Sequence, residues 1–238
     1  MFNFTGKVIV VAGAAGNLGQ AVVRAFLAAG GTVCALDHQK GRLEEIYIEK
    51  NSNGKLFLLD GIDVTVPQQA SDAAKNIDSL AVQPDVLVST VGGYAAGESV
   101  YQLSESLWKK MVDLNIRSFL SLSAAFVPGM ISKGYGKVVT VGAKSGLQGG
   151  AHSGAYSAAK AALLRLTESM ADELKGKGIQ VNCVLPAIID TPQNRQDMPN
   201  ADFSKWVAPE QIAEVILFLS SPASDALTGA ALPVYGSV

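Results

Sequence analysis

The chain has little of several residue types that mark specialised proteins. Its 238 residues include 2 cysteines and 2 histidines, only 17% are charged, and the net charge is −2. Cys34 and Cys183 lie inside apolar runs, which indicates small buried side chains and neither a disulfide nor a metal site. Basic residues do not cluster, so nucleic acid is not an expected partner.

Long apolar runs and a typical leader are also missing. No run approaches the roughly 18 apolar residues of a membrane span. Residues 1–7 lack the features of a signal peptide and lead straight into the first predicted strand. A cytoplasmic protein without a membrane contact is therefore the default expectation. The 48% of hydrophobic residues can fill a sizeable core, and the length suits one domain over residues 1–238.

Short runs rich in β-branched residues alternate with helical patterns along the whole chain. Strands are expected at residues 7–12, 32–37, 55–60, 85–89, 137–141, 180–185 and 231–235, and helices at 18–29, 42–50, 67–80, 104–130, 154–174 and 209–219. The strands are almost continuously apolar, as in a parallel sheet covered on both faces. The pattern predicts a Rossmann-type, doubly wound α/β/α sandwich with seven parallel strands in the order 3-2-1-4-5-6-7.

The turn at residues 12–19 reads Ala-Gly-Ala-Ala-Gly-Asn-Leu-Gly and joins the first strand to the first helix. Glycines here let the backbone approach a pyrophosphate, and the helix N-terminus favours negative charge. A tight strand-to-helix turn needs glycine in any case, so the motif gains weight from the elements on both sides. The expected cofactor contacts in this turn are Gly13, Ala15, Gly16, Asn17, Leu18 and Gly19.

The second strand ends in an acid, Asp37. An acid at this place hydrogen-bonds the ribose hydroxyls of a dinucleotide and repels a 2′-phosphate, which favours NAD(H) over NADP(H). Lys40 is a nearby cation and keeps NADP(H) as the alternative. The plainer interpretation of Asp37 is a turn residue at the end of a strand.

Tyr156 and Lys160 lie four residues apart at the start of a long helical pattern. Residues at this spacing share a helix face. A cation beside a phenol favours the phenolate, so we expect the Tyr156 pKa to lie below its ordinary value of about 10. Such a tyrosine can act as a general acid or base. A surface pair on an amphipathic helix is the alternative for this motif in isolation.

Further short motifs follow one another in a fixed order. Asp63 follows the third strand, the fourth strand runs into Ser-Thr-Val-Gly at residues 89–92, and Asn115 lies in the long helix before Tyr156 and Lys160. Asn182, Pro186, Ala187 and Thr191 come next, and Thr-Gly at 228–229 and Val-Tyr-Gly at 234–236 close the series. In this combination the chain resembles the short-chain dehydrogenase/reductase family over nearly its whole length.

That resemblance implies roles for individual residues. Tyr156 would give or take the proton, Lys160 would lower its pKa and hold the nicotinamide ribose, and Asn115 would hold a relay water. Asp63 would contact adenine, and Thr191 would contact the nicotinamide amide. The other expected cofactor contacts are Val64, Val91, Gly92, Gly93, Pro186 and Ile189. The family also implies a small-molecule substrate and a homotetramer or homodimer formed through the long helices.

One departure from the family concerns its catalytic serine, which lies 13 residues before the tyrosine. Here that position is Ala143. Loss of one such donor costs roughly 10²–10³ in rate for carbonyl chemistry. Three explanations compete. Ser145 substitutes, which makes it a candidate catalytic residue; the substrate does not need the serine; or the protein binds nucleotide without turnover.

Substrate-side segments resemble dihydropteridine reductases, an NADH-using branch of the same superfamily. The similar segments are Gly-Ala-Lys-Ser at 142–145, the glycine-rich loop at 91–97, and residues 185–206, which contain Asp-Thr-Pro-Gln-Asn-Arg. Tyr94 replaces that branch's tryptophan, and Asn115 is typical of ordinary bacterial reductases. The resemblance implies that Tyr156 can donate the proton to a quinonoid dihydropterin, reduced by NADH, without a serine-held carbonyl.

The loop at residues 191–208 is expected to form a substrate-side lid. Tyr94, Phe203 and Trp206 either line a flat pocket or pack against neighbouring elements. Arg195 is a candidate partner of Asp190 or Asp202. The expected function is hydride transfer between NAD(P)(H) and a small carbonyl or alcohol, with dihydropteridine reduction and a non-catalytic nucleotide-binding protein as alternatives.

Overall fold

The computed structural model describes residues 2–47, 55–80 and 83–237. Seven strands form one parallel sheet in the order β3-β2-β1-β4-β5-β6-β7, so the predicted fold and strand order are confirmed. The strands are β1 (Val8–Ala12), β2 (Thr32–Asp37), β3 (Leu56–Asp60), β4 (Val86–Ser89), β5 (Gly136–Val141), β6 (Ile179–Pro186) and β7 (Ala231–Val234).

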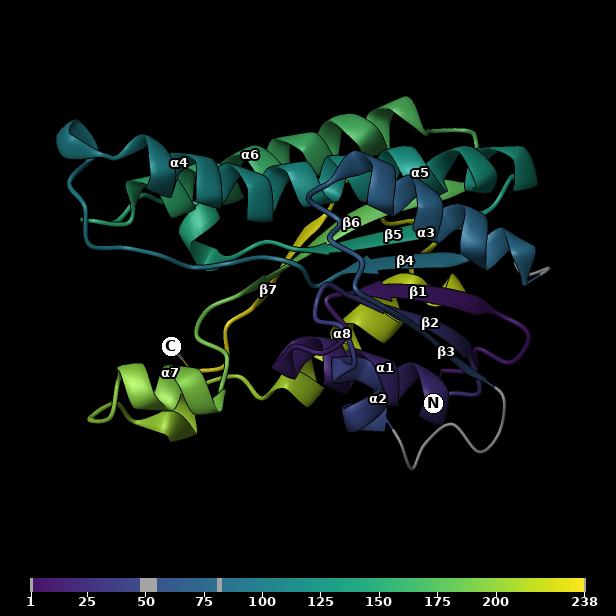
Figure 1. Cartoon of the computed structure of the whole chain (residues 1–238), viewed down its shortest axis with the longest axis horizontal. Coiled ribbons are helices and arrows are strands. Elements are labelled where there is room, and N and C mark those ends of the chain that lie inside the picture. Colours follow the sequence, from purple (N-terminus) through teal and green to yellow (C-terminus); the bar gives the residue numbers. More distant parts are fainter. Residues whose placement is uncertain (1, 48–54, 81–82, 238) are drawn as a thin grey trace.

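Helices cover both faces of the sheet (Figure 1). One layer contains α3 (Pro67–Ser79), α4 (Glu105–Val112), α5 (Ser118–Lys133) and α6 (Gly154–Glu173), and the other contains α1 (Asn17–Ala28), α2 (Arg42–Tyr47) and α8 (Pro209–Ser220). The short helix α7 (Pro192–Asp197) lies apart from both layers, beside the carboxyl ends of the strands. The predicted helix over 42–50 begins as expected, but residues 48–50 lie outside the described residues.

Alternating side chains of β1 show why both layers are needed. Ile9 and Val11 belong to the apolar core under α1 and α8, whereas Val10 and Ala12 belong to the core under α3, α5 and α6. Successive strand residues point to opposite faces, so a wholly apolar strand must be covered twice. Cys34 lies in the second of these cores and Cys183 in a separate small cluster, and both side chains are buried, as predicted.

The single helix predicted over residues 104–130 is wrong in one respect. A π-helical turn, η2 (Asp113–Arg117), separates α4 from α5. Such turns insert one residue into the helical repeat and occur often at functional positions. The combined run Glu105–Lys133 is long and apolar enough to cross a membrane by length and composition. In this fold, however, it packs on the sheet through Phe119, Leu122 and Met130.

Candidate active site

Helix α6 holds Tyr156 and Lys160 one turn apart above the carboxyl end of β5. Lys160 is only 4% exposed, and its Nζ donates a hydrogen bond to the Val141 carbonyl oxygen over 2.7 Å. The same Nζ lies 6.0 Å from the centre of the Tyr156 ring. The predicted pair is therefore a half-buried phenol beside a buried amine, and not a surface ion pair.

The π turn directs Asn115 towards the loop after β4. The side-chain Oδ1 accepts a hydrogen bond from Gly93 N over 3.2 Å, and Nδ2 donates to the carbonyl oxygens of Gly93 (3.1 Å) and Met111 (3.0 Å). Asn115 is 1% exposed. Three hydrogen bonds on a buried amide fix its orientation, because breaking any of them would leave a buried polar group unpaired.

Gly92 marks the point at which these groups meet. A Cβ atom on Gly92 would lie 3.0 Å from Asn115 Oδ1 and 3.1 Å from Lys160 Nζ. The asparagine from η2 and the lysine from α6 therefore approach the same backbone atom. The structure thus brings Asn115 close to Lys160 of the Tyr156–Lys160 pair, from which it is more than 40 residues away in the sequence.

The expectation that the pKa of Tyr156 lies below its ordinary value is wrong. Burial, with a smaller contribution from Tyr94, raises the Tyr156 pKa to about 12, and burial lowers the Lys160 pKa to about 8. The reason is geometric: the described hydrogen bond of Lys160 Nζ goes to the Val141 carbonyl oxygen and not to the phenol. At this separation, the loss of hydration outweighs the attraction of the cation.

The glycine-rich turn forms a cradle below this group. Gly13 has φ +80, and a Cβ there would lie 2.8 Å from Thr90 Oγ1. A Cβ on Gly19 would lie 2.0 Å from the Gly13 carbonyl oxygen, so only glycine lets α1 pack on the turn. Gly16 is the N-cap of α1, and Asn17 is its first residue. The close backbone approach and the helix N-terminus fit the pyrophosphate of a dinucleotide.

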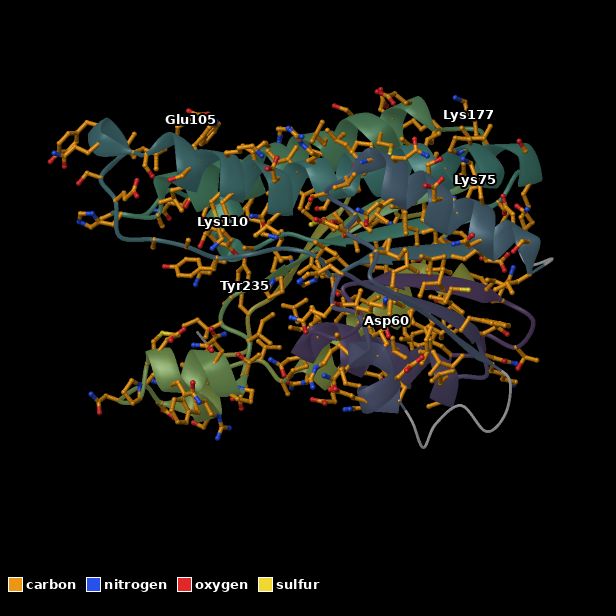
Figure 2. The ribbon with its side chains drawn as sticks, in the orientation of Figure 1. Asp60, Lys75, Glu105, Lys110, Lys177 and Tyr235 are labelled. Atoms are coloured by element: carbon orange, nitrogen blue, oxygen red, sulfur yellow. The ribbon has the colours of Figure 1, made fainter. Side chains whose placement is uncertain are left out.

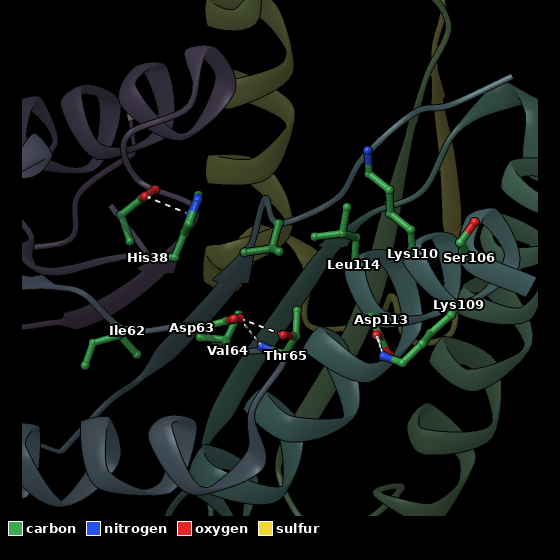
Figure 3. A pocket seen from close by; sticks show the side chains of 13 residues that line it. His38, Ile62, Asp63, Val64, Thr65, Ser106, Lys109, Lys110, Asp113 and Leu114 are labelled. Carbon is green, nitrogen blue, oxygen red and sulfur yellow. Dashed lines mark hydrogen bonds and ion pairs between the residues drawn. The ribbon is translucent and has the colours of Figure 1, made fainter. Parts of the chain in front are cut away.

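A cavity of about 510 Å³ extends from this turn across the carboxyl ends of β1 to β4 (Figure 3). Among the predicted cofactor residues it is lined by Gly13, Asp37, Asp63, Val64 and Val91. It also contains His38, Ser106, Lys109, Lys110 and Leu114, which the sequence interpretation missed or left aside. Ser106, Lys110 and Leu114 are spaced by four residues and share a helix face, so this spacing was the available signal.

Asp37 and Asp63, two of the three acids of the cavity, accept hydrogen bonds from nearby residues. Asp37 accepts hydrogen bonds from Ala15 N (3.0 Å) and Gln39 N (3.1 Å) and lies 3.2 Å from His38 Nδ1. Asp63 Oδ1 accepts from the Thr65 amide (2.9 Å) and hydroxyl (2.7 Å). Both carboxylates are therefore fixed at the cavity wall, and the link from Asp37 to Ala15 ties the end of β2 to the glycine-rich turn.

The remaining predicted cofactor residues lie around β6 and the lid. Pro186 ends β6 and pairs with Val234, and Ile189 forms a parallel bridge with Val207. Leu18 is buried below the cradle. The Thr191 hydroxyl caps α7 by accepting a hydrogen bond from Asn194 N over 3.2 Å. Thr191 thus has a structural contact within its own loop. None of its described contacts tests its predicted role at the nicotinamide amide.

The predicted lid contains α7 and a short 3₁₀ turn, and it is held by ionic and aromatic contacts. Arg195 binds both carboxylate oxygens of Asp190, over 2.6 and 2.7 Å, and its guanidinium lies 4.8 Å from the centre of the Phe203 ring. Phe203 and Trp206 have ring centres 4.8 Å apart. Trp206 is 7% exposed, so its ring packs beneath the predicted lid and is not available as a flat wall of a substrate pocket.

Tyr94 and Ala143 define the substrate side. The Tyr94 ring is 67% exposed, and its centre lies 4.9 Å from that of Tyr156, at an interplanar angle of 83°. Ala143 is buried at the end of β5 and offers no hydroxyl. Ser145 lies in η3 (Lys144–Gly146), where Gly146 packs against the backbone of Lys160. No described contact joins Ser145 to Tyr156.

The chain is similar to known proteins over nearly its whole length. A family model described as short chain dehydrogenase matches residues 7–202. A 3-oxoacyl-[acyl-carrier-protein] reductase from Vibrio cholerae is 30% identical over 244 residues, covering 99% of this chain and 98% of the relative. A 2-dehydro-3-deoxy-D-gluconate 5-dehydrogenase from Bacillus subtilis is 29% identical over 245 residues, covering 99% and 95%.

A solved structure agrees at the level of the fold. A gluconate 5-dehydrogenase from Burkholderia cenocepacia, in complex with NADP and tartrate, has a TM-score of 0.91 at 22% identity, covering 99% of this chain and 96% of that one. The chain belongs to the short-chain dehydrogenase/reductase family. It is an oxidoreductase that uses a nicotinamide cofactor.

Proposed function

We propose that the protein transfers hydride reversibly between NAD(H) and a small carbonyl or alcohol substrate. The observation that carries the proposal is the approach of Lys160 and Asn115 to Gly92, with the Tyr156 ring centre 6.0 Å from Lys160 Nζ, directly after Val91 of the cavity lining. When bound, the nicotinamide supplies or accepts the hydride. The protein's own task is to hold the substrate and to move one proton.

Tyr156 would carry that proton on its Oη. Its raised pKa keeps the phenol protonated at neutral pH, which suits a general acid in the reductive direction. Lys160, with a pKa of about 8, is cationic at pH 7 and would stabilise the phenolate as the proton leaves. Asn115 would hold a relay water next to Gly92, and this water would return a proton to Tyr156.

Five of the proposed cofactor contacts line the cavity: Gly13, Asp37, Asp63, Val64 and Val91. The turn from Gly13 to Gly19 would take the pyrophosphate, Asp37 the adenosine ribose, and Asp63 and Val64 the adenine. The remaining proposed contacts are Val91, Gly92, Gly93, Pro186, Ile189 and Thr191. The preference for NAD(H) rests on the charge of Asp37. The relatives do not support it, and one solved relative is in complex with NADP.

Dihydropteridine reduction is a second candidate. Two observations favour it: Ala143 removes the hydroxyl that would polarise a carbonyl, and the exposed Tyr94 ring lies edge-to-face against Tyr156. A flat ring system could stack on Tyr94 while Tyr156 supplies the proton. None of the three relatives described above is a dihydropteridine reductase. In the carbonyl alternative, Ser145 would have to supply the missing donor.

A substrate panel tests the proposal. NADH and NADPH oxidation would be followed at 340 nm with quinonoid dihydropterin, ketones, aldehydes and a 3-oxoacyl thioester. We expect turnover of at least one substrate, with a loss of 10³-fold or more in kcat for Tyr156→Phe, because the phenylalanine cannot supply the proton. Tyrosine-independent turnover would contradict the assigned role. Turnover of ketones but not of pterin would contradict the second candidate and direct attention to Ser145→Ala.

We also propose that the chain forms a homodimer or homotetramer through α4 and α5. Trp108 and Leu120 are large apolar side chains on these helices, and they are 39% and 47% exposed. Burying them against a second copy would remove that apolar area from water.

A further inference from the structure

Two neighbouring lysines of α4 line the dinucleotide cavity, but they are in different situations. Lys109 forms an ion pair with Asp113, which also binds Arg117 Nε over 3.0 Å. In Figure 3 the Lys109 side chain folds down to Asp113, whereas the Lys110 side chain extends away from the helix in the other direction. Lys109 is therefore held by an ion pair within the helix, whereas Lys110 is not.

Lys110 makes no hydrogen bond or ion pair with any residue in the described parts of the chain. It lies one helical turn before Leu114, and both side chains belong to the cavity lining. Figure 2 shows Lys110 below α4, on the side that faces Tyr235 and the carboxyl ends of the strands. Its charge is thus directed at the ligand space and is not balanced within it.

The other charges on the cavity wall are mostly negative. Asp37, Asp63 and Asp113 are acidic, and Lys109 is paired with the last of them. The glycine-rich turn at residues 12–19 contains neither lysine nor arginine. Its backbone amides can bind a pyrophosphate, but they bring no full positive charge. A dianionic group would therefore meet a wall of acids unless Lys110 offsets them.

We propose that Lys110 binds a phosphate of the dinucleotide and sets its affinity. This inference rests on the proposed function, because it assumes that the cavity takes a nicotinamide dinucleotide. The phosphate could be the pyrophosphate, which NADH and NADPH share, or the 2′-phosphate, which only NADPH carries. A lysine acts on either as a mobile point charge on a long stem.

The test is direct binding of NADH, NADPH, ADP-ribose and adenosine by titration calorimetry. The variants are Lys110→Gln and Lys110→Arg, and the matched control is Lys75→Gln, which removes the same charge from an exposed lysine of α3. For Lys110→Gln we expect Kd to rise about tenfold for NADH and ADP-ribose, as for the loss of one charge-assisted hydrogen bond. Lys110→Arg should restore most of the affinity, and adenosine binding should not change.

The arms of the experiment separate the possible results. A rise in Kd for NADPH alone would support the 2′-phosphate as the partner. The difference between wild type and Lys110→Gln should also shrink in high salt, which a purely structural role would not predict. If Lys110→Gln matches Lys75→Gln for every phosphate-bearing ligand, the inference is wrong. If the wild-type protein binds neither NADH nor NADPH, the proposed function itself fails.

Discussion

Gly92→Ala is the most specific perturbation of the candidate active site. The added methyl would lie 3.0 Å from Asn115 Oδ1 and 3.1 Å from Lys160 Nζ, and among the glycines that the structure describes no other has these two groups as its nearest neighbours. It would also leave the chemistry of every side chain unchanged. The substitution therefore tests geometry alone, without removing a titratable group or a hydrogen-bond donor.

The expected size of the effect follows from these distances. Ordinary contacts of a Cβ atom begin at 3.4 Å, so each neighbour would have to recede by a few tenths of an ångström. Neither can do so freely, because Lys160 is bound to Val141 O and Asn115 makes three hydrogen bonds. A misplacement of 1 Å costs about 10² in rate. Smaller shifts of two cooperating groups should lower kcat roughly 10- to 30-fold.

The assay compares kcat, NADH affinity and melting temperature. The matched control is Gly149→Ala, because a Cβ on Gly149 would have no neighbour within 4 Å. We expect Gly92→Ala to lower kcat by more than any rise in the Kd for NADH, and to cost about 1–2 kcal/mol of stability from overpacking. A kcat within threefold of the Gly149→Ala value would refute the assignment of this junction as the proton-transfer centre.

Three further predictions address the cofactor, the buried lysine and the assembly. Asp37→Asn should lower the ratio of kcat/KM for NADH to kcat/KM for NADPH about tenfold, because the substitution removes the charge that repels a 2′-phosphate. An unchanged ratio would contradict the preference for NAD(H). The pKa of Lys160 is about 8 in the folded protein, against an ordinary 10.5, so the unfolded chain binds more protons between pH 8 and 10.5. Burial of the cationic lysine therefore lowers the free energy of unfolding by its full amount below pH 8, and this loss of stability decreases as the pH rises. The free energy of unfolding of Lys160→Met, measured by urea titration, should therefore exceed that of wild type most at neutral pH, and a pH-independent difference would contradict the burial of a cationic lysine. Leu120→Glu should reduce the mass measured by light scattering if α4 and α5 form the proposed interface, whereas an unchanged oligomer would place the interface elsewhere.

The sequence predicted the sheet well because each strand carries its own signal. A run such as residues 8–12 is apolar at every position, and only burial on both faces explains that pattern. The chain order of such strands and their right-handed connections then leave few topologies. The π turn at Asp113–Arg117 had no comparable signal, because the apolar periodicity continues across it. The interruption of the α-helix becomes apparent only in the structure, where the Asn115 side chain forms hydrogen bonds with the Gly93 backbone.

The identities of the site residues and their ionisation depend on different information. Spacing alone placed Tyr156 and Lys160 on one helix face, and the fold then brought Asn115 to them. The pKa of Tyr156 could not follow from spacing, because it depends on which way Lys160 points and how much water remains. The buried amine bonds to a carbonyl oxygen, and burial then raises the pKa of the phenol. The same limit applies to Lys110, whose proposed role follows from Lys109 being paired with Asp113 while Lys110 is left to face the cavity.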